Sequence, residues 1–279
     1  MACDAAPVPP VSSVVSPKDR FVTVYGRKPV LEVLADPGLT VDKVVLADNA
    51  RGAAADEILR AADARGVVVQ RASAHRVKVL AGNGKQDQGV LADVVAPRMR
   101  PLSVALSARS LPRSVLVLDG ITTPANVGMI IRTATAAGLG GIVVPRRGVA
   151  SLDPLVVKAS AGVAFRAPLL RCATADEAVG ALRTAGYRVF GLAGDARKSV
   201  FEADFGGLAA FVLGGETAGV GADVRGLVHE WVSIPMAGGV ESLNVASAAA
   251  VLCFELVRRA TPASPSSSAP APPKARKER

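Results

Sequence analysis

Hydrophobic and polar positions change in regular blocks along the first part of the chain, and these blocks predict short strands that alternate with helices. Three apolar runs have the length of β-strands, at 41–47, 67–70 and 88–95. Helical spacing of apolar residues fills the segments between them, 52–66 and 73–82. Gly66 ends the first of these segments, as glycine commonly does at a helix C-terminus. We therefore expect a small α/β domain over residues 20–97.

The pattern changes after residue 113, where the apolar runs become continuous. The run at 114–120, SVLVLDG, is typical of a strand covered by helices on both faces. Similar runs follow at 141–145, 187–193, 209–215 and 231–236. The segments between them include two helix starts, Asp153–Pro154 and the capping-box pattern Thr174–Glu177. This alternation predicts an α/β fold over residues 114–260, with a parallel sheet and helices on both of its faces.

Segments rich in proline, serine and alanine lie at the ends and in the middle of the chain. Residues 98–113 carry prolines and arginines and are typical of a linker. Residues 1–19 have the composition of a disordered arm, and residues 261–279 that of a disordered basic tail. The expected organisation is two folded domains joined by one linker.

The composition is sufficient for two hydrophobic cores, and the net charge bears on the kind of binding partner. The chain has 279 residues, of which 50% are hydrophobic, and this is enough for two domains. Its formal net charge of +9 is compatible with a polyanionic partner such as a nucleic acid. Part of that charge lies in the C-terminal tail, where solvation alone would explain it.

Other features of the sequence disfavour several function classes. No apolar run is long enough to span a bilayer, and the N-terminal residues lack the pattern of a secretory signal. The three cysteines are widely separated and the chain has only two histidines, so we expect no metal site. We therefore expect a cytoplasmic protein that binds neither a membrane nor a metal.

Residues 231–259 predict a strand, a glycine-containing loop and a helix in succession. The strand ends at Pro235, and apolar residues from Val245 onward have the spacing of one helix face. Ser242 and Asn244 lie between them, at the helix N-terminus. By themselves these two side chains need do no more than cap the helix. The same loop could equally present them to a ligand.

Three glycine-bearing motifs each follow a predicted apolar strand. They read NVGMIIRTA at 126–134, FVLGGETAGV at 211–220 and IPMAGGVESLNV at 234–245. Ligands of open α/β sheets bind at the carboxyl ends of the strands, so we expect the three loops to share one site. Their sequences and their order resemble the three motifs of the SpoU family of RNA 2′-O-ribose methyltransferases, within the SPOUT superfamily.

The resemblance implies both a fold and a reaction. The implied C-terminal domain is knotted as a trefoil, binds S-adenosylmethionine in the knot and forms a homodimer. It moves a methyl group from this cofactor to a ribose 2′-hydroxyl of RNA. The positions that match the family's cofactor-binding residues are Leu213, Gly214, Gly215, Ile234, Met236, Ser242 and Leu243. The resemblance assigns catalysis to Arg132, with side chains that orient it and the ribose: Asn126, Glu216, Ser242 and Asn244.

The residue types allow part of this chemistry to be argued directly. Gly214 and Gly215 lack a Cβ and would let a flat ring approach the backbone. Neither histidine lies in a motif, and an arginine stays protonated. Arg132 therefore either works with a neighbouring phosphate or stabilises the developing alkoxide, and the sequence leaves both open. Taken singly, Arg132 could also be a solvated arginine and Glu216 a carboxylate at a helix start.

The N-terminal domain carries a candidate RNA contact. The loop AGNGKQDQG at 81–89 is polar and glycine-rich, which is also typical of an ordinary surface loop. As an RNA-binding loop it would offer Lys85 and the amides of Asn83, Gln86 and Gln88 to phosphates and bases. Arg27, in the stretch GRKPVLEVL, is a further candidate for contact with RNA. The stretch GRKPVLEVL together with QGVLADV resembles the accessory substrate-binding domain of SpoU enzymes that act on ribosomal RNA. The layout is most similar to the 23S rRNA guanosine-2′-O-methyltransferases.

Other functions remain as alternatives. Transfer RNA is the alternative substrate to ribosomal RNA. Some family members with this layout confer resistance to antibiotics that target the ribosome, so that role is a further alternative. A nucleotide-binding dehydrogenase would also use a parallel sheet and glycine loops, but the sequence has neither a GxGxxG motif with its acidic partner nor a P-loop. A non-enzymatic RNA-binding protein could share the fold without turnover.

Overall fold

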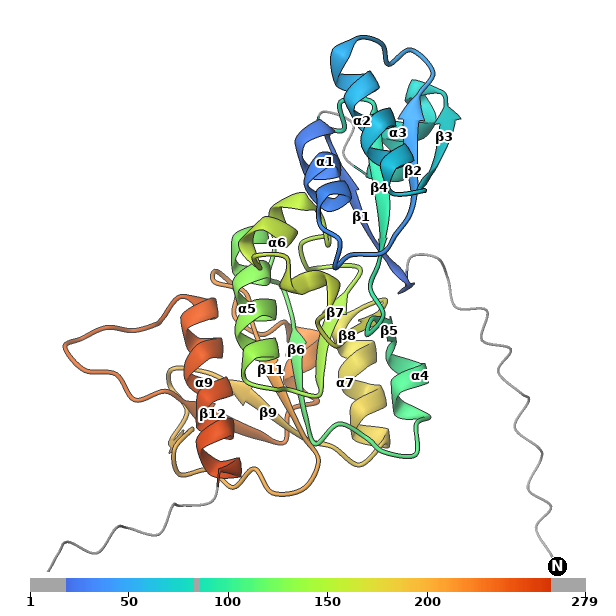
Figure 1. Cartoon of the computed structure of the whole chain (residues 1–279). Helices are drawn as coiled ribbons and strands as arrows, with labels where there is room; N and C mark the ends of the chain where they lie inside the picture. Colours follow the sequence, from blue (N-terminus) through green and yellow to red (C-terminus); the bar gives the residue numbers. More distant parts are fainter. Residues whose placement is uncertain (1–18, 83–85, 262–279) are drawn as a thin grey trace, which may run out of the picture.

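The computed structural model describes residues 19–82 and 86–261, which form two sheet-based domains (Figure 1). The smaller, N-terminal domain contains a four-stranded sheet and the larger, C-terminal domain an eight-stranded sheet. The predicted arm and tail, apart from Asp19 and Thr261, lie outside the described residues. Within those residues, none of the helices combines the length and apolar character that crossing a membrane requires.

The small domain has the predicted alternation of helices and strands. Its elements are β1 (Phe21–Tyr25), α1 (Arg27–Ala35), β2 (Val41–Ala47), α2 (Ala53–Ala64), β3 (Val68–Ala72), α3 (Ala74–Ala81) and β4 (Val90–Val95). The strand order is β1-β4-β2-β3, with β4 antiparallel to both of its neighbours and β2 parallel to β3. Helices α1 and α2 pack on one face of the sheet, and α3 covers the other face through Val77.

Local sequence explains the ends of these helices. Gly26 adopts a φ of 91° between β1 and α1, a conformation that favours glycine. Gly66 follows α2 with a φ of 62°, as the sequence predicts. Ser73 caps α3 by accepting a hydrogen bond of 3.2 Å from the backbone amide of Arg76.

The large domain is built on a sheet in which every pairing is parallel. The strand order is β10-β12-β9-β11-β6-β7-β8-β5. The strands are β5 (Arg100–Pro101), β6 (Ser114–Leu118), β7 (Gly141–Pro145), β8 (Leu169–Cys172), β9 (Arg188–Leu192), β10 (Lys198–Ser199), β11 (Ala209–Leu213) and β12 (Glu230–Ser233). Because the strands are parallel, all of their carboxyl ends lie at one edge of the sheet.

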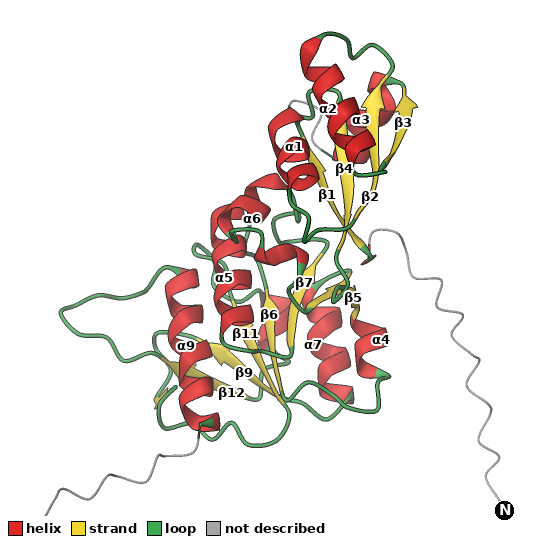
Figure 2. Ribbon diagram, viewed as in Figure 1, coloured by secondary structure: helices red, strands yellow, loops and turns green. Residues whose placement is uncertain are grey.

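Helices cover both faces of this sheet, as the continuous apolar strands require (Figure 2). One face carries α5 (Pro124–Ala136), α6 (Pro154–Ala159), the short 3-10 helix η2 (Val163–Phe165) and α9 (Val245–Ala260). The other face carries α4 (Leu102–Leu106), α7 (Ala175–Thr184) and α8 (Ala222–Arg225). Alternate residues of the central strand β6 point to opposite faces, so that Leu116 joins the first core and Val117 the second.

The connection between the domains is shorter than the sequence indicates. The expected linker, 98–113, contains β5 and α4, which belong to the large domain. Strand β5 pairs with β8, and α4 buries Leu102 and Ala105 against the sheet. Burial of these apolar side chains fixes a segment whose prolines and arginines are typical of a linker.

Polar contacts also join the two domains. Asp19, the first described residue, is 5% exposed and forms an ion pair with Arg146, which follows β7. The hydroxyl of Tyr25 donates a hydrogen bond of 3.3 Å to Asp153, the residue that caps α6. Asp19 therefore belongs to the folded part of the chain and not to the arm expected over 1–19.

Candidate active site

A cavity of about 450 Å³ lies at the carboxyl ends of β9, β11 and β12. Its walls come from the loops that follow these strands and from the first turns of α9. The motif residues in its lining are Leu213, Gly214, Gly215, Glu216, Ile234, Met236, Ser242, Leu243 and Asn244. The tertiary structure thus brings the predicted cofactor-binding residues together, although they come from two separate motifs.

A second set of residues in the lining is not among those predicted. It comprises Leu192, Ala193, Gly194, Asp195, Arg225, Trp231 and Glu241, with others around them. The strand-end rule could have found the first four, because the apolar run at 187–193 is followed by Gly194–Asp195. No comparable signal marks Arg225, whose position depends on α8 between β11 and β12.

Three polar side chains from distant parts of the chain form one network beside the cavity. Glu216 accepts a hydrogen bond from the side-chain amide of Asn126 and another, of 3.0 Å, from that of Asn244. Asn244 also donates a hydrogen bond of 3.1 Å to the amide oxygen of Asn126. A carboxylate that accepts two amide hydrogen bonds is held in one orientation. The network therefore fixes the loop after β11 against the N-termini of α5 and α9.

Asn126 and Asn244 differ in whether they cap their helices. Asn244 caps α9 by accepting backbone hydrogen bonds of 2.9 Å from Ala246 and 3.4 Å from Ser247, so it both caps the helix and joins the network. Asn126 lies within the first turn of α5 and does not cap the helix. The helix begins earlier, at Pro124 after Thr123, because proline fits the first helical position.

The glycines of the second motif are required by the packing of the protein's own backbone. A Cβ at Gly214 would lie 2.1 Å from the carbonyl carbon of Gly219, and one at Gly215 would lie 2.3 Å from the carbonyl oxygen of Gly120. Backbone thus occupies the space that a Cβ at either position would need, while both glycines line the cavity. Gly215 and Gly219 also exchange two backbone hydrogen bonds, of 3.0 and 2.9 Å. These glycines let three backbone segments pack closely at the base of the cavity.

Arg132 lies apart from this cavity. It is an exposed residue of α5, and its guanidinium makes no hydrogen bond or ion pair with any residue that the structure describes. It follows Asn126 by six positions, which places it about 9 Å further along the helix and on a different side of it. The single chain therefore brings together every predicted site residue of the large domain except Arg132.

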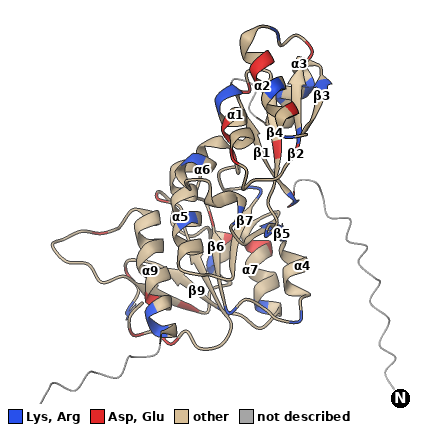
Figure 3. Ribbon diagram, viewed as in Figure 1, with Lys and Arg blue, Asp and Glu red and all other residues tan. Residues whose placement is uncertain are grey.

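The predicted RNA-binding residues belong to the small domain. The side-chain oxygen of Gln88 accepts a hydrogen bond of 3.0 Å from the backbone amide of Arg27, so these two residues are neighbours. The guanidinium of Arg27 is exposed. Asn83 and Lys85 lie outside the described residues. Lysine and arginine occur on both domains, as Figure 3 shows.

Thiol and metal chemistry have no support in the described residues. Those residues contain no group of three or more His, Cys, Asp or Glu side chains that could hold a metal ion. Burial raises the pKa of Cys172 and that of Cys253 to about 12, so neither is a thiolate at neutral pH. The Nδ1 atom of His229 accepts a hydrogen bond of 2.9 Å from the backbone amide of Val189, at the amino end of β9 and away from the cavity.

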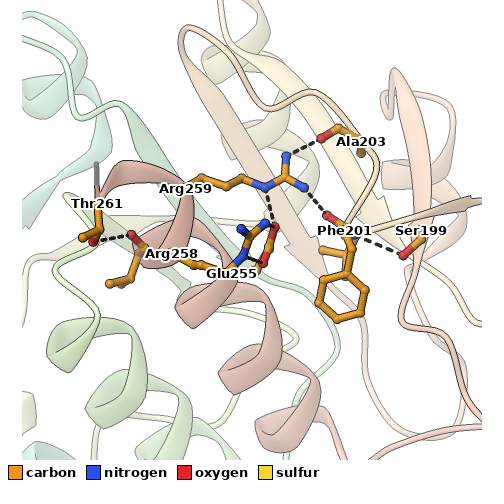
Figure 4. A network of polar contacts seen from close by, with 9 residues as sticks. Ser199, Phe201, Ala203, Glu255, Arg258, Arg259 and Thr261 are labelled. Carbon is orange, nitrogen blue, oxygen red and sulfur yellow. Dashed lines mark hydrogen bonds and ion pairs between the residues drawn. The ribbon is translucent and has the colours of Figure 1, made fainter. Parts of the chain in front are cut away.

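The far end of α9 is also held by polar contacts (Figure 4). Glu255 accepts hydrogen bonds from Arg258, of 2.7 and 2.8 Å, and from Arg259, of 2.5 Å. Arg259 in turn donates to the carbonyl oxygens of Ala203 and Val200, the latter at 2.8 Å. This cluster joins the C-terminus of α9 to the segment after β10, and that segment follows the cavity-lining loop 192–195 along the chain.

Comparison with known proteins identifies the family. The family model described as the SpoU rRNA methylase family matches residues 113–254, and the model for RNA 2′-O ribose methyltransferase substrate binding matches residues 23–100. The chain belongs to the SpoU family. The family resemblance of the three motifs and the α/β fold with a parallel sheet are thereby confirmed. The trefoil knot stays a prediction.

Individual SpoU proteins match over most of the chain. The 23S rRNA (guanosine-2′-O-)-methyltransferase RlmB of Ralstonia nicotianae is 35% identical over 226 residues, which is 79% of this chain and 88% of the relative. An uncharacterized tRNA/rRNA methyltransferase of Mycolicibacterium vanbaalenii is 34% identical and covers 85% of this chain, with 76% of its own length matched.

A solved structure is also similar. The SpoU methyltransferase AviRb from Streptomyces viridochromogenes, in complex with the cofactor AdoMet, has a TM-score of 0.57 and 28% identity. The match covers 85% of this chain and 90% of the other. AdoMet is S-adenosylmethionine, the cofactor that the family resemblance implies.

The residues around the cavity fit this cofactor. A volume of about 450 Å³ lies in the range of small-molecule sites, and the lining combines apolar side chains such as Ile234 and Met236 with charged ones. The cofactor combines a flat adenine with two cationic groups, its sulfonium and its α-ammonium, and one carboxylate, so a lining of apolar side chains and carboxylates suits it.

Proposed function

We propose that this SpoU protein transfers a methyl group from S-adenosylmethionine to a ribose 2′-hydroxyl of RNA. The observation that carries the proposal is the convergence of motifs two and three around one cavity, with motif one tied to them through the network of Asn126, Glu216 and Asn244. Membership in the family and the AdoMet complex of AviRb support the same cofactor.

The chain's own residues position the reactants. S-adenosylmethionine supplies the methyl group when it is bound. Apolar side chains and backbone groups from Leu213 to Gly215 and from Ile234 to Met236 hold it at the strand ends. Arg132 offers a guanidinium with five donors that either stabilises the developing alkoxide or grips a phosphate that takes part in the proton transfer.

The substrate that we propose is 23S ribosomal RNA. Relatives named 23S rRNA (guanosine-2′-O-)-methyltransferase support it, as does the substrate-binding model that matches the small domain. In that domain, Arg27 and Gln88 lie side by side and offer a cation and an amide to RNA. We place the activity in the cytoplasm, where ribosomal RNA is made and assembled.

We also propose that the protein works as a homodimer, through the helix pair α5 and α9. These helices pack side by side, and each exposes a large apolar side chain, Met129 at 40% and Phe254 at 53%. Arg132 lies three positions after Met129 on α5, so a second copy on this surface would border it. Mass measurement in solution tests this: the wild type is expected at twice its chain mass of 28.4 kDa.

Two matched variants make the dimer test specific. Phe254→Asp places a charge on the proposed interface and is expected to yield a monomer. Leu155→Asp changes a residue of α6 that is equally exposed, at 51%, and is expected to remain a dimer. A monomeric wild type, or equal effects of the two changes, would contradict the proposed interface.

The central experiment measures methyl transfer from tritium-labelled S-adenosylmethionine to total ribosomal and transfer RNA. We expect label in 23S rRNA, in a form that resists alkali because the ribose hydroxyl is methylated. Arg132→Ala is expected to reduce the rate by at least about 100-fold, the size of effect seen when one donor to a developing oxyanion is removed. Arg183→Ala, an exposed arginine of α7, serves as the control.

Each other outcome of this experiment has a defined meaning. Label in transfer RNA alone would support the proposed methyl transfer and identify transfer RNA, in place of 23S rRNA, as the substrate. Cofactor binding without transfer to any RNA would favour the non-enzymatic RNA-binding alternative. The absence of cofactor binding would contradict the proposed function as a whole.

A further inference from the structure

Two carboxylates in the cavity lining have no assigned role. Asp195 follows β9, and Glu241 belongs to the long loop between β12 and α9, which leaves the body of the domain in Figure 1. Both side chains are exposed, and neither makes a hydrogen bond or an ion pair with any described residue. The two loops meet, since a Cβ at Gly194 would lie 3.0 Å from the carbonyl oxygen of Glu241.

The other charged groups of the lining are already engaged. Glu216 accepts the two asparagine hydrogen bonds of the network. Arg225 donates from Nε to the carbonyl oxygen of Val220 at 3.2 Å, and its guanidinium lies 5.4 Å from the ring centroid of Trp231. Asp195 and Glu241 are therefore the carboxylates of the described lining that remain available to a ligand.

The charge of the cavity is opposite to that of the protein. Three carboxylates and one guanidinium give the lining a formal net charge of −2, whereas the chain as a whole carries +9. Such a cavity repels a phosphate and attracts a cation. S-adenosylmethionine has two cationic groups, its sulfonium and its α-ammonium, and one carboxylate.

We propose that Asp195 and Glu241 are specificity residues that bind the cationic groups of S-adenosylmethionine. The inference rests on the proposed function, because it concerns the same cofactor. It goes beyond the predicted site residues by assigning the recognition of charge to Glu241, which lies in the third motif, and to Asp195, which lies outside all three motifs. Methyl transfer converts the sulfonium into a neutral thioether. A carboxylate that faces the sulfonium therefore favours binding of S-adenosylmethionine over binding of the product, S-adenosylhomocysteine.

Calorimetric binding to three ligands of graded charge tests the inference without any turnover. S-adenosylmethionine has both cations, S-adenosylhomocysteine keeps only the α-ammonium, and 5′-methylthioadenosine has neither. The variants are Asp195→Asn and Glu241→Gln, which remove charge and preserve shape. Glu57→Gln, an exposed carboxylate of α2 in the other domain, is the matched control.

We expect each cavity variant to weaken S-adenosylmethionine binding by about 3- to 10-fold, the size typical of a partly exposed charge pair. Binding of 5′-methylthioadenosine should not change, and Glu57→Gln should change nothing. An equal loss for S-adenosylhomocysteine assigns the carboxylate to the α-ammonium, and an unchanged affinity for it assigns the carboxylate to the sulfonium. Either result supports the inference.

Two results would overturn it in distinguishable ways. Equal weakening of all three ligands, with the fold confirmed by an unchanged melting temperature, would mean that the residues only shape the cavity. Unchanged affinities for all three would mean that they contact no ligand. Both leave the proposed function intact, whereas a wild type that binds none of the three ligands would contradict the function and the inference together.

Discussion

The side-chain amide of Asn244 donates a hydrogen bond of 3.1 Å to the side-chain oxygen of Asn126, 118 positions earlier in the chain. Both asparagines also donate to Glu216, so the first turns of α5 and α9 and the loop after β11 share one polar centre. Asn244 additionally caps α9. One residue therefore contributes to helix stability and to the geometry of the site.

Substitutions at Asn244 separate these two contributions. Asn244→Ala removes the cap and the network contacts and is expected to lower the free energy of unfolding by about 1–2 kcal/mol. Asn244→Ser keeps an oxygen that caps the helix but loses the amide that reaches Glu216. We expect the serine variant to regain most of the stability in urea denaturation and to remain impaired in methyl transfer. Full recovery of both properties would contradict a role for the network.

Gly214 should not tolerate a side chain. In Gly214→Ala the new Cβ would meet the backbone of Gly219, which has no flexible end to move aside. We expect a loss of at least about 2 kcal/mol in unfolding free energy, as for a strained core position, together with weaker cofactor binding. Gly226→Ala is the control, because a Cβ there meets nothing within 4 Å and its φ of −68° suits alanine. Equal stability of the two variants would show that the backbone around Gly214 and Gly219 shifts to accommodate the new Cβ at little cost.

Glu255 should make part of the stability depend on pH. Hydrogen bonds from Arg258, and then the one from Arg259, lower the pKa of this carboxyl from 4.5 to about 2. A lowered pKa stabilises the folded state above pH 4.5, and this contribution is lost as pH falls from 4.5 to about 2. Because the Arg258 side chain is 68% exposed, solvent screens the pair, and we expect about 1 kcal/mol.

Urea denaturation of the wild type and of Glu255→Gln, at pH 7 and at pH 3, measures this contribution. The variant should be less stable at pH 7 and approach the wild type at pH 3. A difference that stays constant with pH would mean that Glu255 acts only through packing.

Arg27 should contribute to RNA binding through charge. Arg27→Ala is expected to weaken RNA binding and to reduce the slope of log affinity against log salt concentration by about 1, because one fewer counterion is released. Its backbone hydrogen bond to Gln88 is kept, so the local fold should persist. Binding of S-adenosylmethionine should not change, since Arg27 belongs to the other domain. Arg60→Ala on α2 is the control, and an equal effect there would indicate a diffuse charge effect.

The sequence by itself determined most of the strands and helices and the gathering of motifs two and three at one cavity, but it did not predict β5, β8 or β10. Continuous apolar runs such as 114–120 specify strands buried on both faces, and the parallel order of the strands follows from their alternation with helices. Motif residues such as Leu213 and Met236 were predicted to share one site, and they line one cavity. These properties depend on local periodicity and on the rule that ligands bind at strand ends.

The tertiary structure decided what the individual residues do. The reason for glycine at 214 depends on the backbone of Gly219 and Val220, and the place of Asn126 depends on Glu216 and Asn244. Asp195 joins the cavity because its loop meets that of Glu241, whereas Arg132 remains outside because six helical positions turn it away from Asn126. The periodicity of apolar residues indicates which face of a helix or strand is buried, but it does not indicate which distant element packs against that face.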